Sequence, residues 1–127
     1  MRRIVLDMQC TLFADAISQA LTSNDPDFEP SRTEVPDETV RLCKSSRAYA
    51  LIMEVTGNTP RSLEERLELS RKIRENVSGC KIVLLVDEEA DPTLAAKVRQ
   101  AKKDGLVDNF IYASISPAYL SAVIDAL

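Results

Sequence analysis

The sequence predicts a single α/β domain with an open parallel β-sheet that is covered by helices on both faces. The chain has 127 residues, 45% hydrophobic and 28% charged, which is the composition of one ordinary globular domain. Short apolar segments alternate five times with longer segments of helical periodicity. Apolar strands joined by helices form parallel sheets that are buried on both sides. Five such units are too few to close an eight-stranded barrel, so we expect an open, doubly wound sheet.

The expected strands are short apolar runs, and one of them carries a proline. Pro30 lies inside the second run, FEPSRTEV. A proline cannot donate a hydrogen bond to a neighbouring strand, so this strand is expected at an edge of the sheet. The strand order 2-1-3-4-5 of a flavodoxin-like (βα)5 fold places the second strand there. The five expected strands are residues 4–8, 28–35, 49–55, 81–86 and 109–115.

The expected helices are marked by residues that are typical of helix ends. Ser62 and Glu65 have the spacing of a capping box. Asp91 and Ser116 each stand directly before a proline, as a cap followed by the first helical residue. Gly105 is placed to stop a helix. The five expected helices are residues 12–21, 36–47, 62–76, 91–105 and 116–127, with turns or loops at 23–27 and 56–62.

A functional crevice is expected where the strand order reverses. In open α/β sheets, ligands bind beyond the carboxyl ends of the strands at this point. The residues that this rule places at the crevice are Asp7, Met8, Gln9, Glu54, Val55, Thr56, Val86 and Asp87.

Charge and hydropathy exclude several classes of function. Sixteen basic and twenty acidic residues give a net charge of −4, which argues against nucleic-acid binding by this domain alone. No apolar run reaches the roughly 18–20 residues that span a bilayer. The N-terminal MRR is followed by a strand-like segment with an acid and does not form a signal peptide. We therefore expect a cytoplasmic protein without a membrane role.

The sequence lacks the residues of common catalytic sites. It has no His, which excludes Ser-His and Cys-His catalysis and His-ligated metals. Cys10, Cys43 and Cys80 are widely separated and are expected to be reduced. Cys10 follows the first strand, but residues 11–15 contain no Gly or Arg that could cradle a phosphate. With no dinucleotide or Walker motif present, we expect no enzyme and no cofactor.

The order of the elements and three short segments carry a resemblance to a known family. VLDMQCTLFADAI (residues 5–17) matches the frame of its first strand and helix, RKIR (71–74) its third helix, and SPAYL (116–120) the start of its last helix. The chain resembles a response-regulator receiver domain of the LuxR/NarL type over residues 1–127. In such receivers, two acids after the first strand hold Mg²⁺ and an Asp ending the third strand accepts the phosphoryl group. A hydroxyl residue after the fourth strand and a lysine after the fifth respond to it.

The resemblance places these positions on residues that depart from the pattern. The acid pair falls on Met8 and Gln9, the phosphate acceptor on Glu54, the hydroxyl residue on Val86 and the lysine on Ala113. A frame shifted by one residue would bring Asp7 into the acid pair without restoring the other positions.

The chemistry of these side chains predicts a lost metal site. Mg²⁺ prefers hard oxygen ligands, whereas Met8 offers a soft sulfur and Gln9 a neutral carbonyl. Without a metal or a lysine, no evident cation neutralises an incoming phosphate. Glu54 is expected to be a remnant acid at the mouth of the crevice; the alternatives are a mimic of phospho-aspartate or a phosphorylated residue. Asp7 and Asp87 are residual acids that we expect to cap loops rather than to bind a metal.

The resulting hypothesis is a pseudo-receiver, a module of two-component or phosphorelay signalling that regulates transcription without Asp phosphorylation. We expect the N-terminal part of a longer regulator, a homodimer through the last helix, and a sensor kinase or another protein as partner. DNA would be bound only through a missing C-terminal domain. Three alternatives stay open: a phosphorylation-competent receiver with Mg²⁺ that uses Glu54 or Asp7, a small flavodoxin-like enzyme, and a stand-alone adaptor. The charge-rich residues 62–76 are expected to form a solvated helix face.

Overall fold

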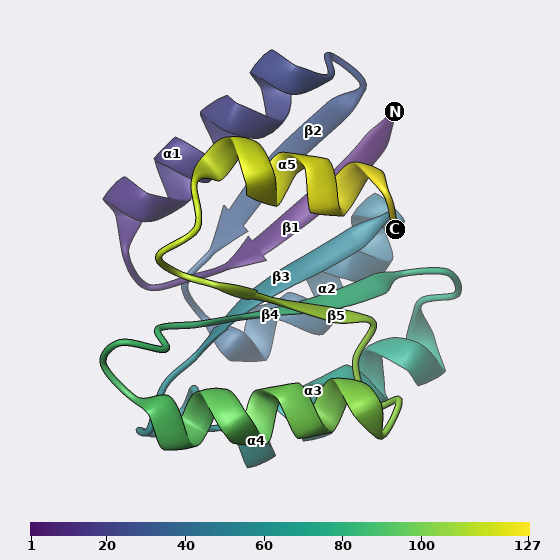
Figure 1. Cartoon of the computed structure of the whole chain (residues 1–127). Coiled ribbons are helices and arrows are strands. Elements are labelled where there is room, and N and C mark those ends of the chain that lie inside the picture. The colour runs from purple at the N-terminus through teal and green to yellow at the C-terminus, as the bar shows by residue number, and fades with distance from the viewer.

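The computed structural model describes all 127 residues except the side chain of Pro117. Five strands alternate with five helices along the described residues (Figure 1). The strands are β1 (Arg2–Asp7), β2 (Phe28–Thr33), β3 (Ala50–Val55), β4 (Lys81–Val86) and β5 (Asn109–Tyr112). The helices are α1 (Thr11–Asn24), α2 (Pro36–Ser46), α3 (Leu63–Asn76), α4 (Pro92–Lys103) and α5 (Pro117–Asp125).

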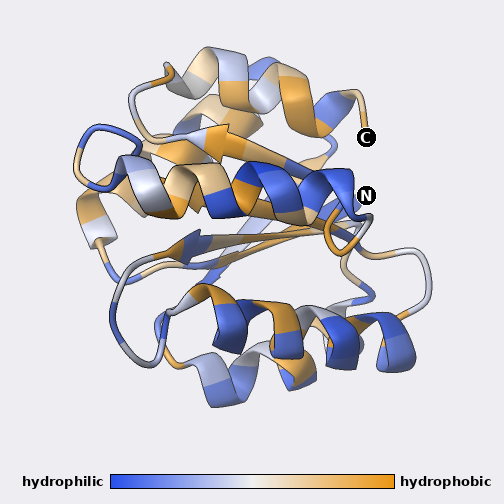
Figure 2. Cartoon of the chain, turned by 60° about the horizontal axis from the view of Figure 1, so that its bottom comes forward, coloured by the Kyte–Doolittle hydropathy of each residue, from blue (hydrophilic) through white to orange (hydrophobic). Residues whose placement is uncertain are grey.

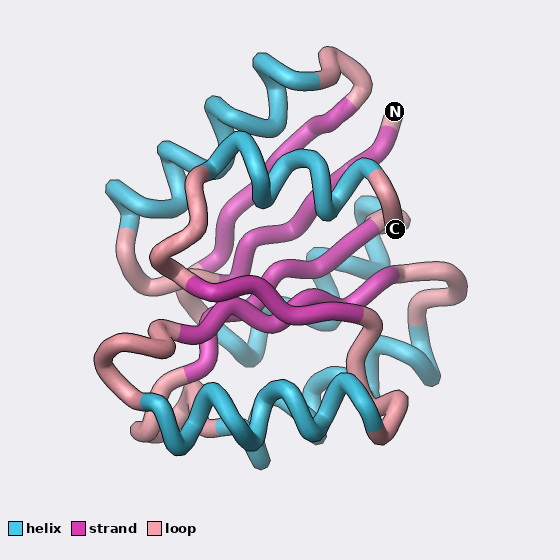
Figure 3. Tube along the Cα trace, viewed as in Figure 1, coloured by secondary structure: helices cyan, strands magenta, loops and turns pink.

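The strands form one parallel sheet in the order β2-β1-β3-β4-β5. This confirms the predicted flavodoxin-like fold class, with β2 and its Pro30 at an edge. Helices α1 and α5 cover one face of the sheet, and α2, α3 and α4 cover the other (Figures 1 and 3). The reversal of the strand order lies between β1 and β3, as expected.

Each face of the sheet has its own hydrophobic core. Successive side chains of a strand point to opposite faces, so Ile4 and Leu6 of β1 pack under α1 and α5 while Val5 packs under α2–α4. Hydrophobic residues gather on the strands and on the helix sides turned toward them (Figure 2). None of the described helices is both long enough and apolar enough to cross a membrane.

The predicted helix caps are present. The side-chain oxygens of Ser62, Asp91 and Ser116 each accept a hydrogen bond from the backbone N–H three residues later. Gly105 has a φ of 76° directly after α4, in the left-handed region that favours glycine. These three helices therefore begin where the sequence predicted.

Several element boundaries differ from the prediction. β5 ends at Tyr112 rather than at residue 115, because the chain turns there and the N–H of Ile115 bonds to the Tyr112 carbonyl. β1 ends at Asp7, one residue before the expected end. α1 continues to Asn24 into the expected turn, since the N–H of Asp25 still reaches the Leu21 carbonyl.

The two ends of the chain lie close together, at the amino ends of the strands (Figure 1). The guanidinium of Arg2 pairs with Asp25 at 2.5 Å and with Asp125 at 2.9 Å, and it stacks 4.1 Å above the ring of Phe28. The hydroxyl of Tyr49 donates to the carbonyl of Leu127 at 2.8 Å. These contacts join the start of β1 to the ends of α1 and α5.

Candidate functional site

A cavity of about 580 Å³ opens at the carboxyl end of the sheet. It includes Glu54, Asp87 and Ala113 of the predicted site residues, and Cys10 also lines it. Asp7, Met8 and Val86 are buried and do not line it. The structure thus divides the predicted site into residues that face the cavity, residues that belong to the protein interior, and Gln9, which is exposed outside the cavity. The full lining is Cys10, Phe13, Glu54, Val55, Thr56, Gly57, Asn58, Leu85, Asp87, Ala90, Asp91, Leu94 and Ala113.

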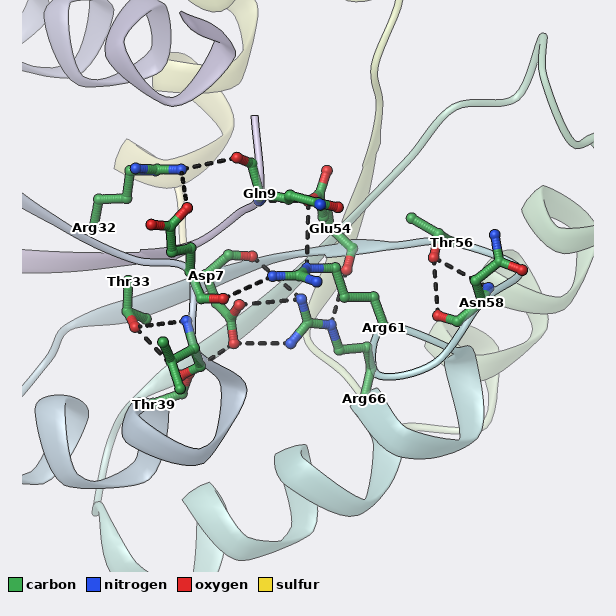
Figure 4. Close-up of polar contacts among 12 residues, drawn as sticks. Asp7, Gln9, Arg32, Thr33, Thr39, Glu54, Thr56, Asn58, Arg61 and Arg66 are labelled. Carbon is green, nitrogen blue, oxygen red and sulfur yellow. Dashed lines mark hydrogen bonds and ion pairs between the residues drawn. The ribbon is translucent and has the colours of Figure 1, made fainter. Parts of the chain in front are cut away.

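Asp7 is fully buried and forms an ion pair with Arg66 of α3 (Figure 4). Arg66 donates from Nη1 to Oδ2 at 2.8 Å and from Nη2 to Oδ1 at 3.2 Å. The hydroxyl of Thr39 donates to Oδ2 at 2.6 Å. The predictions that Asp7 caps a loop or remains as an acid of the crevice are therefore wrong, because both carboxylate oxygens are occupied inside the protein.

Arg66 links the ends of two strands to α3. Its Nε donates to the backbone carbonyl of Glu54 at 2.8 Å, while its Nη2 also approaches the Asp7 carbonyl at 3.3 Å. A buried ion pair persists when its remaining hydrogen-bonding groups are satisfied, as they are here. The guanidinium therefore fixes the distance between β1, β3 and α3.

The solvated face expected for residues 62–76 is present, with Glu64, Glu68 and Arg71 exposed, but the other side of α3 also buries polar side chains. Arg66 and Ser70 are buried, and the Ser70 hydroxyl donates to the Arg66 carbonyl at 2.8 Å. The signal was present in the sequence, since Leu63, Arg66, Ser70 and Ile73 follow the spacing of one helix face. Two polar residues on that apolar stripe indicate a buried polar network.

Glu54 is held by neighbours on two sides. Its Oε1 accepts a hydrogen bond from the backbone N–H of Gln9 at 2.6 Å and lies 3.5 Å from Nε of Arg61. At that distance the contact with Arg61 is ionic rather than a hydrogen bond. The side chain of Glu54 is 20% exposed and that of Arg61 is 9% exposed. Arg61 is therefore a cation beside Glu54 that the sequence did not identify.

Arg61 was missed because it lies in the expected loop 56–62. Its Nη2 donates to the backbone carbonyl of Glu34 at 2.8 Å, so the side chain bridges the β2–α2 loop and Glu54 (Figure 4). Arg32 of β2 donates from Nη2 to the carbonyl of Gln9 at 2.8 Å and contacts Glu34 at 3.2 Å. The backbone of Gln9 is thus fixed from both of its sides.

The remaining positions of the receiver pattern are apolar. Met8 packs in the core beneath α1 and α5, whereas Val86 packs in the core beneath α2–α4. Ala113 is half-buried, and its N–H donates to the carbonyl of Val86 at 2.9 Å. None of the three side chains offers an oxygen ligand.

Asp87 follows β4 and stabilises its own loop. Its Oδ1 accepts hydrogen bonds from the N–H groups of Glu89 and Ala90, both at 3.1 Å. Asp91 uses its Oδ1 to cap α4 through the N–H of Leu94 at 3.0 Å. Each of these two carboxylates keeps a second oxygen outside its loop contacts.

These side chains do not fit the Mg²⁺ that the receiver resemblance implies. Both oxygens of Asp7 bind Arg66, Met8 contributes a sulfur, and Glu54 is already paired. Across the described residues, no three His, Cys, Asp or Glu side chains are grouped so that they could hold a metal ion.

The three thiols have different surroundings. Cys10 is exposed, while Cys43 and Cys80 are buried in the core under α2–α4. The neighbouring Cys80 thiol raises the pKa of Cys43 far above its usual range, whereas Cys43 lowers the pKa of Cys80. Burial raises the pKa of Cys43 further.

Comparisons with known proteins identify the fold. No protein-family profile and no curated protein matches the sequence. A LuxR-family DNA-binding response regulator from Staphylococcus aureus matches with a TM-score of 0.76 and 16% identity over 99% of this chain and 98% of its own. A response regulator from Thermotoga maritima matches with a TM-score of 0.76 and 17% sequence identity, over 99% of this chain and 96% of its own. A CheY-like receiver domain from Methanospirillum hungatei matches with a TM-score of 0.77 and 16% sequence identity, over 99% of this chain and 92% of its own. The structural neighbours are thus response-regulator receiver domains, and the chain has their CheY-like fold.

Proposed function

We propose that this chain is an atypical receiver module of signal transduction that works without Asp phosphorylation and without Mg²⁺. The observation that carries the proposal is the ion pair between Asp7 and Arg66. In this pair, the carboxylate of Asp7, which directly precedes the positions of the receiver's Mg²⁺-binding acids, is already neutralised by the guanidinium of Arg66. Transcription regulation, a homodimer, a sensor kinase and a DNA-binding domain elsewhere in the protein belong to the same proposal, supported by the receiver fold of the neighbours.

The energetics of Asp7 oppose a metal at this position. A metal that recruited Asp7 would have to remove Arg66 from both carboxylate oxygens. Breaking a buried ion pair at one partner costs about 3–5 kcal/mol. Met8, the next residue, would return only a thioether, which Mg²⁺ does not favour.

Glu54 is similarly unsuited to accept a phosphoryl group. Its Oε1 is engaged by the Gln9 N–H and faces Arg61. The Arg61 guanidinium instead pairs with Glu54 at the end of β3. This pair favours the alternative in which Glu54 mimics a phosphorylated aspartate. In that role, Glu54 holds the module in one signalling state.

An NMR titration tests the proposal. Amide spectra are recorded with Mg²⁺ alone and with Mg²⁺ plus beryllofluoride, an analogue of the phosphoryl group. We expect no saturable shifts at residues 7–9, 54–57, 86–87 and 109–115. A receiver with the complete set of acids, hydroxyl and lysine serves as the positive control.

The opposite result would refute the proposal. Saturable beryllofluoride shifts at Glu54 that require Mg²⁺ and spread into β5 would mean that a phosphorylation switch operates here. The variant Glu54→Gln should then lose those shifts, which would identify the acceptor.

A further inference from the structure

The cavity at the carboxyl end of the sheet has the size and lining of a small-molecule site. Its volume of about 580 Å³ lies within the roughly 300–1,000 Å³ of such sites. Phe13, Val55, Leu85 and Leu94 contribute apolar walls from α1, β3, β4 and α4. A phosphoryl pocket would need polar donors here, whereas these side chains can only pack against a hydrophobic group.

The charges in the lining are all negative. Glu54, Asp87 and Asp91 line the cavity, and no Lys or Arg is among its lining residues. The other polar residues are engaged in their own loop, where the Thr56 hydroxyl and the Asn58 backbone bond to each other (Figure 4). The carboxylates therefore determine the charge of the ligand that the cavity can hold.

Each of the three carboxylates has one oxygen in use and one without a partner among the described residues. Glu54 uses Oε1 for Gln9 and Arg61, Asp87 uses Oδ1 to stabilise its loop, and Asp91 uses Oδ1 to cap α4. The free Oδ2 of Asp91 lies 3.7 Å from the point where a Cβ on Gly57 would stand. Since Gly57 is a lining residue without a side chain, this oxygen has open space beside the cavity wall.

We propose that this cavity binds a small organic cation, a primary amine carried on an aromatic ring or a short hydrocarbon chain. The inference rests on the proposed function, because it puts a ligand where a receiver would hold its phosphoryl group. An ammonium group has N–H donors and no acceptor, which suits a lining whose charged groups are all carboxylates. The hydrocarbon part packs on Phe13, Leu85 and Leu94. An anion of the same shape would meet carboxylates only.

A matched pair of probes tests both the cavity and its charge preference. The amide spectrum of the full chain is titrated with 2-phenylethylamine and, separately, with 3-phenylpropionate, which keeps the ring and reverses the charge. We expect saturable shifts around residues 10–13, 54–58, 85–94 and 113 with the amine, and binding of the carboxylate weaker by about tenfold or more. Equal binding of both probes, or no saturation with the amine, overturns the proposal.

Variants of the wall locate the binding. Ala113→Leu and Ala90→Leu each fill the cavity from a different loop, and both should abolish saturable binding of the amine. Ala122→Leu on the exposed side of α5 is the matched control and should bind as the native chain does. The amide spectrum of each filling variant shows whether it is folded. If one of the two variants fails to fold, the other still tests the site. If folded Ala90→Leu or Ala113→Leu binds normally, the site is elsewhere and the proposal fails.

The charges are tested by substitutions that keep the loop caps. Asp87→Asn with Asp91→Asn retains a side-chain oxygen for each capping bond and removes two negative charges. The double variant should bind 2-phenylethylamine about tenfold more weakly and should reduce its advantage over 3-phenylpropionate. Alkylation of the exposed Cys10 gives a second readout, since a bound amine should slow it in the native chain and not in Ala113→Leu. Unchanged affinity and unchanged alkylation rates would contradict the proposal.

The beryllofluoride titration separates this inference from the function on which it rests. If neither beryllofluoride nor the amine binds, the cation site fails while the phosphate-independent receiver stands. If beryllofluoride with Mg²⁺ binds saturably, the proposed function fails, and competition between beryllofluoride and the amine shows whether the cavity also takes a cation.

Discussion

Asp7 and Arg66 form a two-pronged ion pair that is closed to solvent, with contacts of 2.8 Å and 3.2 Å between the guanidinium and the carboxylate. The two residues are 59 positions apart and join β1 to α3. Thr39 of α2 adds a third element through its bond to the same carboxylate. The pair is therefore a junction between the sheet and two of the helices on one face.

Removing one member of this pair should be costly. Arg66→Met leaves the Asp7 carboxylate buried without its cation, and we expect the free energy of unfolding to fall by about 3–5 kcal/mol in urea denaturation. Arg71→Met on the exposed side of α3 is the control and should change stability far less, because its ion pairs are exposed to solvent. The double variant Asp7→Asn with Arg66→Met should lose less than the sum of its single changes. Equal losses for the two arginine variants would show that the buried pair is not a junction.

The loop after β3 should depend on Arg61. Arg61→Ala removes the cation beside Glu54 and the donor to Glu34, and we expect a loss of about 1–3 kcal/mol with faster amide exchange at residues 9 and 56–62. Arg61→Lys keeps the positive charge but cannot contact Glu54 and Glu34 in the same geometry. Its stability should lie between those of the native chain and Arg61→Ala. Exchange rates that stay native in Arg61→Ala would mean that Glu54 is held by Gln9 alone.

The fold could be predicted from the sequence because its signals are local and repeated. Apolar runs, proline and serine at helix starts and Pro30 at an edge all point to the same sheet, and the strand order followed from a general rule. The arginines could not be placed in the same way, since their partners are distant in sequence. Arg61 reaches Glu34 across 27 residues and Arg66 reaches Asp7 across 59. Only the apolar spacing around Arg66 carried a hint of its burial.

The candidate site was predicted in position and not in detail. Glu54 lines the cavity near the end of its strand, Ala113 lines it at a position that only the receiver resemblance indicated, and Asp7 turns inward. In a parallel strand, the alternation of side chains decides which face a residue joins, and the presence of a buried arginine on α3 decides whether an acid can stay there. The sequence shows the first of these and not the second.

The three cysteines should differ sharply in reactivity. Iodoacetamide should modify Cys10 in the native chain and leave Cys43 and Cys80 intact, because both are buried. The neighbouring Cys43 lowers the pKa of Cys80, so exclusion of the reagent, and not a high pKa, protects Cys80. Peptide mapping by mass spectrometry measures this, with the urea-unfolded chain as the control in which all three react. Native alkylation of Cys43 at the rate of Cys10 would contradict the buried placement.

The surface of α3 offers a test of pH dependence. A hydrogen bond from Arg71 lowers the pKa of Glu68. A carboxyl with a lowered folded pKa contributes stability above its unfolded pKa and loses it as the pH falls through the folded value. Since the pair is exposed, the effect on unfolding is small. Carbon NMR titration of the Glu68 carboxyl should show a higher pKa in Arg71→Gln than in the native chain. An unchanged pKa would mean that Arg71 does not lower the pKa of Glu68.

The contacts of Arg2 and Tyr49 that bring the ends of the chain together also determine how the molecule can be handled. Both ends leave the domain at the pole opposite the cavity (Figure 1). A chip, a bead or a fluorescent protein attached to either end would therefore leave the mouth of the cavity facing the bulk solution. A short peptide could also join the two ends, which would allow new termini to be cut in a surface loop without reordering the sheet.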